Sequence, residues 1–216
     1  REHMLANGWQ PVEGDTALLT KQYGSGASRH TALCATYVDD IIMSAPPKHE
    51  KQIWREIAAR FVFAEPEETT RFLGMHYQLK SEITKDDAAS KTIVHLHQKE
   101  YVQHIVRQGE EKVGHTTRTR LTPGPDAKPS GPDADKNDCG TQVRSAIGAL
   151  LYLARGTRPS IAYSVGMLSR RSTKWNEHGA RDLTQLLGFI KSSEDVPLIF
   201  TNARDRWDDL DLIIYS

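Results

Sequence analysis

The sequence TALCATYVDDIIMSA spans Thr31–Ala45 and consists of two apolar runs on either side of an acidic pair, Asp39 and Asp40. Both runs are rich in β-branched and apolar residues, and two prolines follow the second run; this pattern is typical of a β-hairpin. We therefore expect strands at about residues 31–38 and 41–45, with both carboxylates at the tip. Because this tip contains no glycine that would ease the turn, we also expect backbone strain there, which is common at functional sites.

The two carboxylates at the tip suggest a first functional hypothesis. Adjacent residues in a regular strand point to opposite faces of the sheet, so Asp39 and Asp40 can serve one ligand only if the backbone turns there. Two carboxylates at a turn suit a hard cation that keeps some of its water and takes phosphate oxygens as further ligands, and Mg²⁺ fits this description best. The alternative is an ordinary solvated turn, because acids are common turn residues.

Composition places the chain among globular proteins with one large domain or two small ones. Its 216 residues are 38% hydrophobic and 26% charged, and the 28 basic residues equal the 28 acidic ones, so net charge does not indicate a nucleic-acid partner. The distribution of charge does. Residues 141–181 contain a single acid, Glu177, and seven basic residues: Arg144, Arg155, Arg158, Arg170, Arg171, Lys174 and Arg181. A phosphate backbone could use such a block, although many basic blocks are solvated helix faces.

Other classes of site have weaker support. Cys34 and Cys139 are too few for a disulfide framework and are not spaced as a zinc site, so a reducing compartment is expected. His95 and His97 fall on one face of an expected strand, but a structural zinc site needs four well-placed ligands, and a surface or nucleic-acid-facing role fits better. No apolar run approaches ~18 residues, so no membrane partner is expected.

Hydrophobic periodicity predicts the remaining elements of the first half. A helix at about 48–61 should cover one face of the sheet that carries the hairpin. A second hairpin should pair 71–80 with 92–97, and Gly74 marks a bulge or a close approach by another backbone. A short helix should follow at 98–108.

The second half is expected to be helical. It begins with a stretch dense in Pro, Gly, Asp and Lys, which indicates a flexible linker. Three amphipathic helices with short connections then follow, and they should form a small bundle before a closing pair of strands at about 196–200 and 210–215. The expected parts are 1–108 with both hairpins, the linker 109–140, the helical part 141–193 and the closing segment 194–216.

Several separated blocks resemble the reverse transcriptase of copia-type retrotransposons, in the order in which that family has them. The tetrad Tyr37–Asp40 resembles the polymerase motif of reverse transcriptases. The other blocks are Gly8-Trp9 with Asp15, Phe72-Leu73-Gly74, Gln98 with Tyr101, Leu121-Thr122-Pro123, RSAIGALLYLARGTRPSIAYSVGMLSR at 144–170 and LDLIIYS at 210–216. They extend over essentially the whole chain, which is similar to the palm, thumb and connection portion of the Pol polyprotein.

This resemblance implies an α+β fold: a partial right-hand polymerase palm (an antiparallel sheet with helices), then a helical thumb bundle and a short β connection. Asp39 and Asp40 would be two of the three palm carboxylates that hold two Mg²⁺ ions, with Mn²⁺ as a substitute, for nucleotidyl transfer. Tyr37 would lie against the primer terminus. The primer grip would comprise Phe72, Leu73, Gly74, Met75 and His76. The thumb residues on the nucleic-acid backbone would be Arg144, Arg155, Arg158, Arg170, Arg171 and Lys174.

Structural alternatives stand beside two of these roles. Phe72 and Leu73 could equally be core residues. Arg158 could equally be a helix-start residue with a structural ion pair.

The resemblance also implies partners and a location. An intact enzyme of this kind copies an RNA template into DNA, holds an RNA–DNA or DNA duplex, and uses deoxynucleoside triphosphates inside cytoplasmic virus-like particles; a nuclear location is the alternative. The fingers, the palm strand with the third catalytic Asp and the RNase H domain have no counterpart here. Ser160 stands where the family has Asp, and Gly188–Ser192 is a loosened form of its Tyr-Leu-Lys-Gly motif.

Both ends of the chain look cut, so it resembles an interior piece of the polyprotein. We therefore expect the chain alone to be catalytically inactive, because two carboxylates cannot assemble a two-metal site by themselves. The alternatives are a non-catalytic nucleic-acid-binding module and a decayed or domesticated remnant of a retroelement.

Overall fold

The structure is a computed structural model that describes residues 1–26, 29–68, 70–82, 91–113, 123, 140–173 and 175–202. Within these residues the fold is α+β, with two four-stranded antiparallel sheets and six α-helices, so the expected class is confirmed. The chain divides into two compact units, Arg1–Phe72 and Leu73–Ser216.

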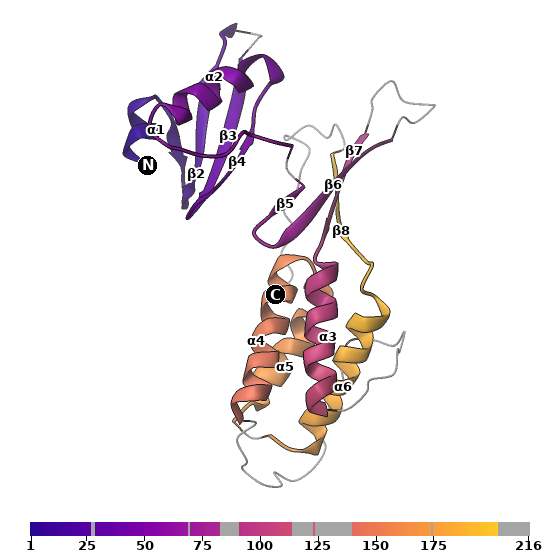
Figure 1. Ribbon diagram of the computed structural model, residues 1–216. Coiled ribbons are helices and arrows are strands. Elements are labelled where there is room, and N and C mark those ends of the chain that lie inside the picture. The colour runs from indigo at the N-terminus through magenta and orange to yellow at the C-terminus, as the bar shows by residue number, and fades with distance from the viewer. Residues whose placement is uncertain are drawn as a thin grey trace. The chain divides into compact units, whose positions relative to one another are not determined.

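The first unit is a sheet in the order β1-β2-β3-β4 with two helices (Figure 1). The register pairs Cys34 with Leu19 on one side and with Met43 on the other, and all neighbouring strands are antiparallel. The elements are α1 (Glu2–Ala6), β1 (Gln10–Val12), β2 (Asp15–Tyr23), β3 (His30–Tyr37), β4 (Asp40–Ser44) and α2 (Pro47–Ala58).

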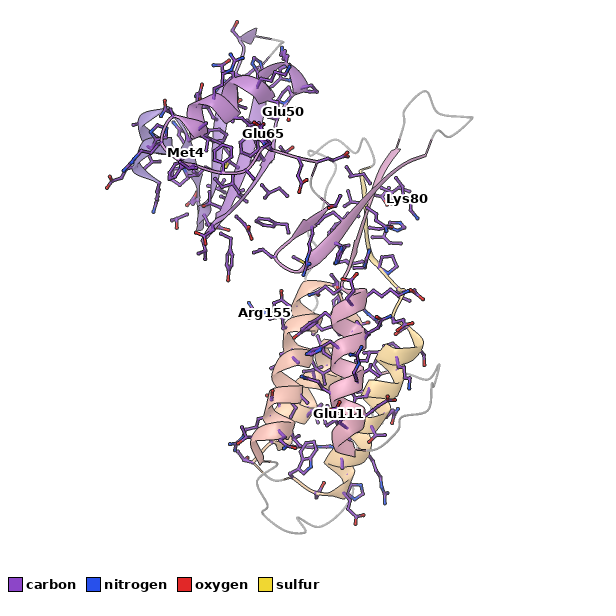
Figure 2. The ribbon with its side chains drawn as sticks, in the orientation of Figure 1. Met4, Glu50, Glu65, Lys80, Glu111 and Arg155 are labelled. Carbon is purple, nitrogen blue, oxygen red and sulfur yellow. The ribbon has the colours of Figure 1, made fainter. Side chains whose placement is uncertain are left out.

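The core of this unit lies between one face of the sheet and its two helices. Alternation along β3 directs Ala32 and Cys34 to this face, and both are fully buried. Met4 of α1, labelled in Figure 2, packs in the same cluster as Ile53 and Ile57 of α2. Within the described part of the unit, no helix packs against the opposite face, so residues on that side of β3 and β4 remain accessible.

The other sheet has the order β5-β6-β7-β8, and its strands β6, β7 and β8 belong to the second unit. A short strand, β5 (Arg71–Phe72), comes just before the boundary between the units. The longer strands are β6 (Met75–Glu82), β7 (Lys91–His97) and β8 (Leu198–Asn202). His97 lies opposite His76, and Leu96 lies opposite Leu198, so β8 returns from the far end of the described chain to pair with β7.

Four helices form a bundle in the second unit (Figure 1): α3 (Lys99–Val113), α4 (Gly140–Gly156), α5 (Ala162–Arg171) and α6 (Glu177–Ser192). A 3₁₀ turn, Pro159–Ile161, links α4 to α5. Leucine, isoleucine and valine side chains from all four helices fill the core. The side chain of Asn176 accepts a hydrogen bond from the Gly179 amide at 3.1 Å, which caps the start of α6.

α3 and α6 approach each other closely at Gly109. An ideal Cβ built on Gly109 would lie 2.6 Å from Cδ1 of Leu187, whose side chain is completely buried. The ion pair between Lys191 Nζ and Glu110 Oε1, at 2.5 Å, joins the same two helices. The absence of a side chain at residue 109 therefore permits this packing.

The structure confirms the first hairpin, the helix after it and the three later helices. The second hairpin is present as β6 and β7. The structure corrects three expectations. The strand expected at 71–80 is divided, because β5 ends at Phe72 and β6 begins at Met75. Gly74 lies in a two-residue turn between β5 and β6 rather than in a bulge, and α3 continues to Val113 and packs in the bundle, where a linker from residue 109 had been expected. Residues 114–122 and 124–139 of that linker, and the strand expected at 210–215, lie outside the described residues.

Candidate functional site

The tip of the first hairpin is a two-residue turn. Tyr37 and Asp40 are paired in the β3–β4 register, so Val38 and Asp39 form the turn between them. Val38 has a φ of 51°, in the left-handed region that β-branched residues rarely adopt. Holding a non-glycine residue there costs about 1–3 kcal/mol. The expected strain at the tip is therefore present.

Because of the turn, the side chains of the two acids need not point to opposite faces of the sheet. Asp39 lies in the turn and Asp40 is the first residue of β4, so the strict alternation of a strand does not separate them. Both side chains are exposed. In the described part of the chain, neither carboxylate has an ion pair or a side-chain hydrogen bond, and no group of three His, Cys, Asp or Glu side chains could hold a metal ion.

The acidic pair therefore supplies two hard oxygen donors of the kind that Mg²⁺ prefers. This donor set fits a cation that takes its other ligands from water, phosphate oxygens or a further carboxylate.

An open, partly apolar surface lies beside Asp40. Cross-strand partners point to the same side of a sheet, so Tyr37 and Asp40 share the face opposite the core. Tyr37 is 57% exposed. Leu33, which lies on the same face of β3 four residues before Tyr37, is 41% exposed. Ile42 of β4 lies opposite Ala35 on this face. Asp40 thus lies at the end of a partly exposed sheet face, with the Tyr37 ring on the same face.

A second strained turn lies at the start of the second unit. Leu73 and Gly74 separate β5 from β6, with φ values of 50° and 73°. Positive φ at both positions is characteristic of the type I′ turn, which matches the twist of a hairpin. Glycine adopts this conformation without strain, but leucine does not. Phe72, Leu73 and Met75 are half-buried.

His76, also expected in the primer grip, is engaged by two neighbours. Its ring stacks on that of His97, with centroids 5.1 Å apart, and its Nε2 lies 2.7 Å from Oε2 of Glu100. Burial, with a further contribution from His76, lowers the pKa of His97 below its usual value. His95, the other member of the sequence pair, lies opposite Gln78 in the register of β6 and β7.

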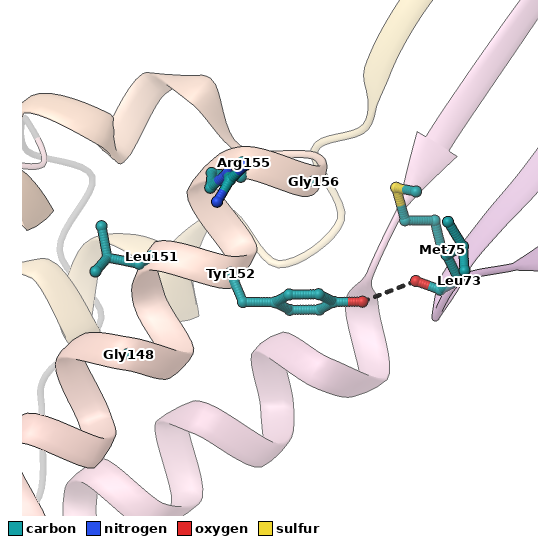
Figure 3. A pocket seen from close by; sticks show the side chains of 7 residues that line it. All are labelled: Leu73, Met75, Gly148, Leu151, Tyr152, Arg155 and Gly156. Atoms are coloured by element: carbon teal, nitrogen blue, oxygen red, sulfur yellow. Dashed lines mark hydrogen bonds between the residues drawn. The ribbon is translucent and has the colours of Figure 1, made fainter. Parts of the chain in front are cut away.

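A pocket of about 540 Å³ lies between the Leu73-Gly74 turn and α4 (Figure 3). Most of its wall is apolar, and Arg155 provides the charge. Tyr152 points from α4 to the turn, where its hydroxyl donates a hydrogen bond to the carbonyl oxygen of Leu73 at 2.8 Å. The lining residues are Leu73, Met75, Gly148, Leu151, Tyr152, Arg155 and Gly156.

The six basic residues expected on a nucleic-acid backbone fall into three groups. Arg144, Arg155 and Arg170 are exposed, and Figure 2 labels Arg155 on the outer side of α4. Arg158 is only 4% exposed and donates hydrogen bonds to Ser193, and Arg171 forms an ion pair with Asp182 of α6. Lys174 lies outside the described residues.

Arg158 therefore has a structural role, as the alternative to phosphate contact predicted. Its partners are hydrogen-bond acceptors of Ser193 rather than the expected acid of an ion pair. The guanidinium of Arg158 is turned inward and is not available to a phosphate. Arg171 is half-buried in its ion pair.

Sequence reasoning missed Tyr152. Its 48% exposure places it outside the bundle core, although the sequence around it reads as a core helix. The signal that could have found it is an aromatic side chain on the outer face of an amphipathic helix, which needs a partner from another element.

Comparison with known proteins adds no further support. No protein-family model matches the chain, and no solved structure is significantly similar to it. Among the described residues, none of the helices combines the length and the apolar character needed to cross a membrane.

Proposed function

We propose that this chain is the palm, thumb and connection portion of an RNA-directed DNA polymerase of the copia type. The observation that carries the proposal is the first hairpin, whose strained turn exposes two adjacent carboxylates beside Tyr37. Strain at an exposed tip is destabilising, and it persists where function requires the geometry. The ordered sequence blocks that resemble the family are the second support.

In this proposal Asp39 and Asp40 hold two Mg²⁺ ions together with a third carboxylate from an upstream palm strand. Such ions, when bound, activate the primer 3′-hydroxyl and neutralise charge on the incoming triphosphate. Asp39 and Asp40 supply oxygen ligands from a hairpin that is anchored by its buried face. Tyr37, on the same face as Asp40, provides an aromatic surface for the last base of the primer.

The helical bundle holds the duplex in this proposal. Arg155 and Arg170 are exposed and, within the described residues, make no ion pair; Arg144 is exposed as well. Contacts from such residues to phosphates position a duplex without reading its sequence. Arg158 and Arg171 support the bundle itself and are left out of this surface. An enzyme of this kind works in cytoplasmic virus-like particles, which is the location we propose.

Primer extension tests the proposal. The chain alone should be inactive, and co-expression with an upstream copia-type fingers and palm segment should restore extension of a DNA primer on an RNA template with Mg²⁺. Asp39→Asn should abolish the restored activity. Glu13→Gln, which changes another exposed acid of the same unit, should leave it within about twofold. Extension by the chain alone, or restored extension that survives Asp39→Asn, would contradict the proposal.

A non-catalytic nucleic-acid-binding module is the second candidate, favoured by the exposed arginines of the bundle. In this case the chain binds an RNA–DNA duplex with an affinity that falls steeply with salt, and binding survives Asp39→Asn. The upstream segment should then restore no extension. A decayed remnant differs from both, because it should neither bind the duplex nor extend a primer.

A further inference from the structure

The hydrogen bond between Tyr152 and Leu73 joins two elements of the second unit that are 79 residues apart in the sequence. The Oη–O distance of 2.8 Å is close to the optimum for a hydroxyl donor. Tyr152 is 48% exposed, whereas Leu150 and Leu153 beside it in α4 are completely buried. The ring of Tyr152 therefore contributes little to the core of the bundle, and its hydroxyl makes its specific contact outside that core.

The partner of this hydroxyl is a turn with few conformational alternatives. Leu73 is held at a φ of 50°, which is unfavourable for a side chain of its kind. An ideal Cβ at Gly74 would lie 3.1 Å from the Tyr152 hydroxyl oxygen, so the hydroxyl also limits the size of residue 74. The Tyr152 hydroxyl therefore constrains both turn residues: it binds the carbonyl oxygen of Leu73 and leaves little room for a side chain at Gly74.

A second tyrosine holds the ring of Tyr152. Tyr101 of α3 meets Tyr152 edge to face, with centroids 5.2 Å apart and an angle of 79° between the rings. The Tyr101 hydroxyl donates to the Ala149 carbonyl oxygen at 3.5 Å, a long contact directed at α4. Burial raises the pKa of Tyr101, and the nearby Tyr152 adds to this effect. Support of this kind from a neighbouring helix restricts a side chain to one rotamer.

The turn and α4 line the open pocket of about 540 Å³ in Figure 3. Leu73 and Met75 form its wall on the side of the turn, and Leu151 and Tyr152 form its wall on the side of α4. Arg155 is the only charged residue in this lining, it is exposed, and among the described residues it makes no ion pair. An apolar wall with one cation at its edge suits a sugar–phosphate unit of a nucleic-acid strand.

We propose that Tyr152 is a positioning residue that fixes the Leu73-Gly74 turn against α4, so that the end of a bound DNA strand is held between the turn and Arg155. This inference rests on the proposed function, because it assigns the strand to the nucleic acid that the unit binds. Tyr152 acts through the turn and does not touch the reacting atoms.

Tyr152→Phe tests the inference in the full chain, because it removes the hydroxyl and keeps the ring. Tyr163→Phe is the matched control, since Tyr163 of α5 is 61% exposed and has no hydrogen bond among the described residues. The first measurement is amide exchange of residues 73–76. The second is fluorescence anisotropy at one salt concentration, comparing a DNA duplex that has a recessed 3′ end with a blunt duplex of the same paired length.

The parent chain and Tyr163→Phe should bind the recessed duplex about tenfold more tightly than the blunt one, as expected for one well-formed contact. Tyr152→Phe should exchange the turn amides faster, keep its affinity for the blunt duplex, and bind both duplexes within about twofold of each other. Gly74→Ala disturbs the same contact from the side of the turn, and it should lose the preference in the same way.

The outcomes separate the two proposals. If the parent chain binds neither duplex, the proposed function fails. If the parent chain binds both duplexes equally, or if Tyr152→Phe and Gly74→Ala keep the preference for the recessed end, the positioning role is overturned while nucleic-acid binding stands. Faster amide exchange without loss of the preference would give Tyr152 a structural role only, which also overturns the inference.

Discussion

Arg158 donates two hydrogen bonds to Ser193, with Nη1 2.8 Å from the carbonyl oxygen and Nη2 2.7 Å from Oγ. These bonds tie the connection between α4 and α5 to the C-terminal end of α6. The guanidinium also lies over the ring of Phe189, 5.7 Å from its centroid. Burial lowers the pKa of Arg158 from its usual value, so the surrounding hydrogen bonds are needed to stabilise the charged form.

Replacing this arginine with lysine should destabilise the second unit. Arg158→Lys keeps the charge but loses the planar fork, so we expect the free energy of unfolding to fall by about 2–3 kcal/mol. Urea denaturation followed by circular dichroism measures the change. Arg107→Lys, on the exposed face of α3, is the control and should stay within about 0.5 kcal/mol of the parent chain. Equal stability of the two variants would show that the Ser193 contacts contribute nothing.

Two glycines in helices should respond to alanine in opposite directions. Gly109→Ala places a methyl group against the buried Leu187, and overpacking of this kind should lower the free energy of unfolding by about 1–3 kcal/mol. A Cβ on Gly166 of α5 would meet nothing within 4 Å, so Gly166→Ala should raise stability by up to about 1 kcal/mol through helix propensity. Thermal unfolding of both variants checks the signs, and a stabilising Gly109→Ala would contradict the close approach of α3 and α6.

The strain at the first hairpin can be relieved without changing its acids. Asparagine tolerates the left-handed region better than valine, so Val38→Asn should raise the free energy of unfolding of the first unit by about 1 kcal/mol. Val38→Ala keeps the unfavourable φ and should give a smaller gain. Urea denaturation followed by tryptophan fluorescence in a Trp175→Phe, Trp207→Phe background would follow this unit, because the remaining Trp9 and Trp54 both belong to it and Trp9 is 1% exposed in its core. Destabilisation by asparagine would mean that valine is not strained at this position.

Cys34 should resist alkylation in the folded chain. Its side chain is completely buried, and burial raises the pKa of its thiol to about 11, so the reactive thiolate is scarce near pH 8. In a Cys139→Ser background, mass spectrometry should find little iodoacetamide adduct in buffer and complete labelling in urea. Rapid labelling in buffer would indicate that the sheet and α2 do not enclose Cys34.

The stacked histidines should make the second unit less stable in acid. Burial and the neighbouring His76 lower the folded-state pKa of His97, whereas Glu100 and Asp195 oppose this shift and Lys99 adds to it. As the pH falls below about 6.5, His97 binds a proton in the unfolded chain before it does so in the folded chain. The free energy of unfolding therefore decreases as the pH falls from about 6.5 to the lower pKa of His97 in the folded chain. His97→Gln should flatten the pH dependence of the melting temperature below about pH 7, while the exposed His30→Gln should not.

The parts of this fold that were predictable are those that depend on neighbouring residues in the chain. Two apolar runs and an acidic pair were sufficient for the first hairpin, and the lack of glycine was sufficient for the strain now found at Val38. The stripes of α4 and α6 likewise placed Leu150 and Leu186 in the core, because 3.6-residue periodicity is a local property.

What could not be predicted depends on contacts between distant segments. A helix was expected to end before Gly109, because the stretch that follows is dense in Pro, Gly, Asp and Lys, but α3 continues through Gly109, where the absence of a side chain permits packing against Leu187. The family resemblance implied that Arg158 contacts a phosphate, with a structural role as the alternative, and it is Ser193, 35 residues later, that holds Arg158 inside. Tyr152 and Leu73 meet across 79 residues, and no local pattern specifies that pair.

The pairing of β7 with β8 has a consequence for how the chain folds during synthesis. The second sheet gains its last strand only after Leu198 has been synthesised and can pair with Leu96. The apolar face of α3 is likewise covered only after α6 has been synthesised. The buried cluster of the first unit runs only from Met4 to Ile57, so this unit can begin to fold while later residues are still being synthesised. In the second unit the β7–β8 pair joins residues that are far apart in the sequence, so until residue 198 emerges its incomplete core remains a target for chaperones and proteases.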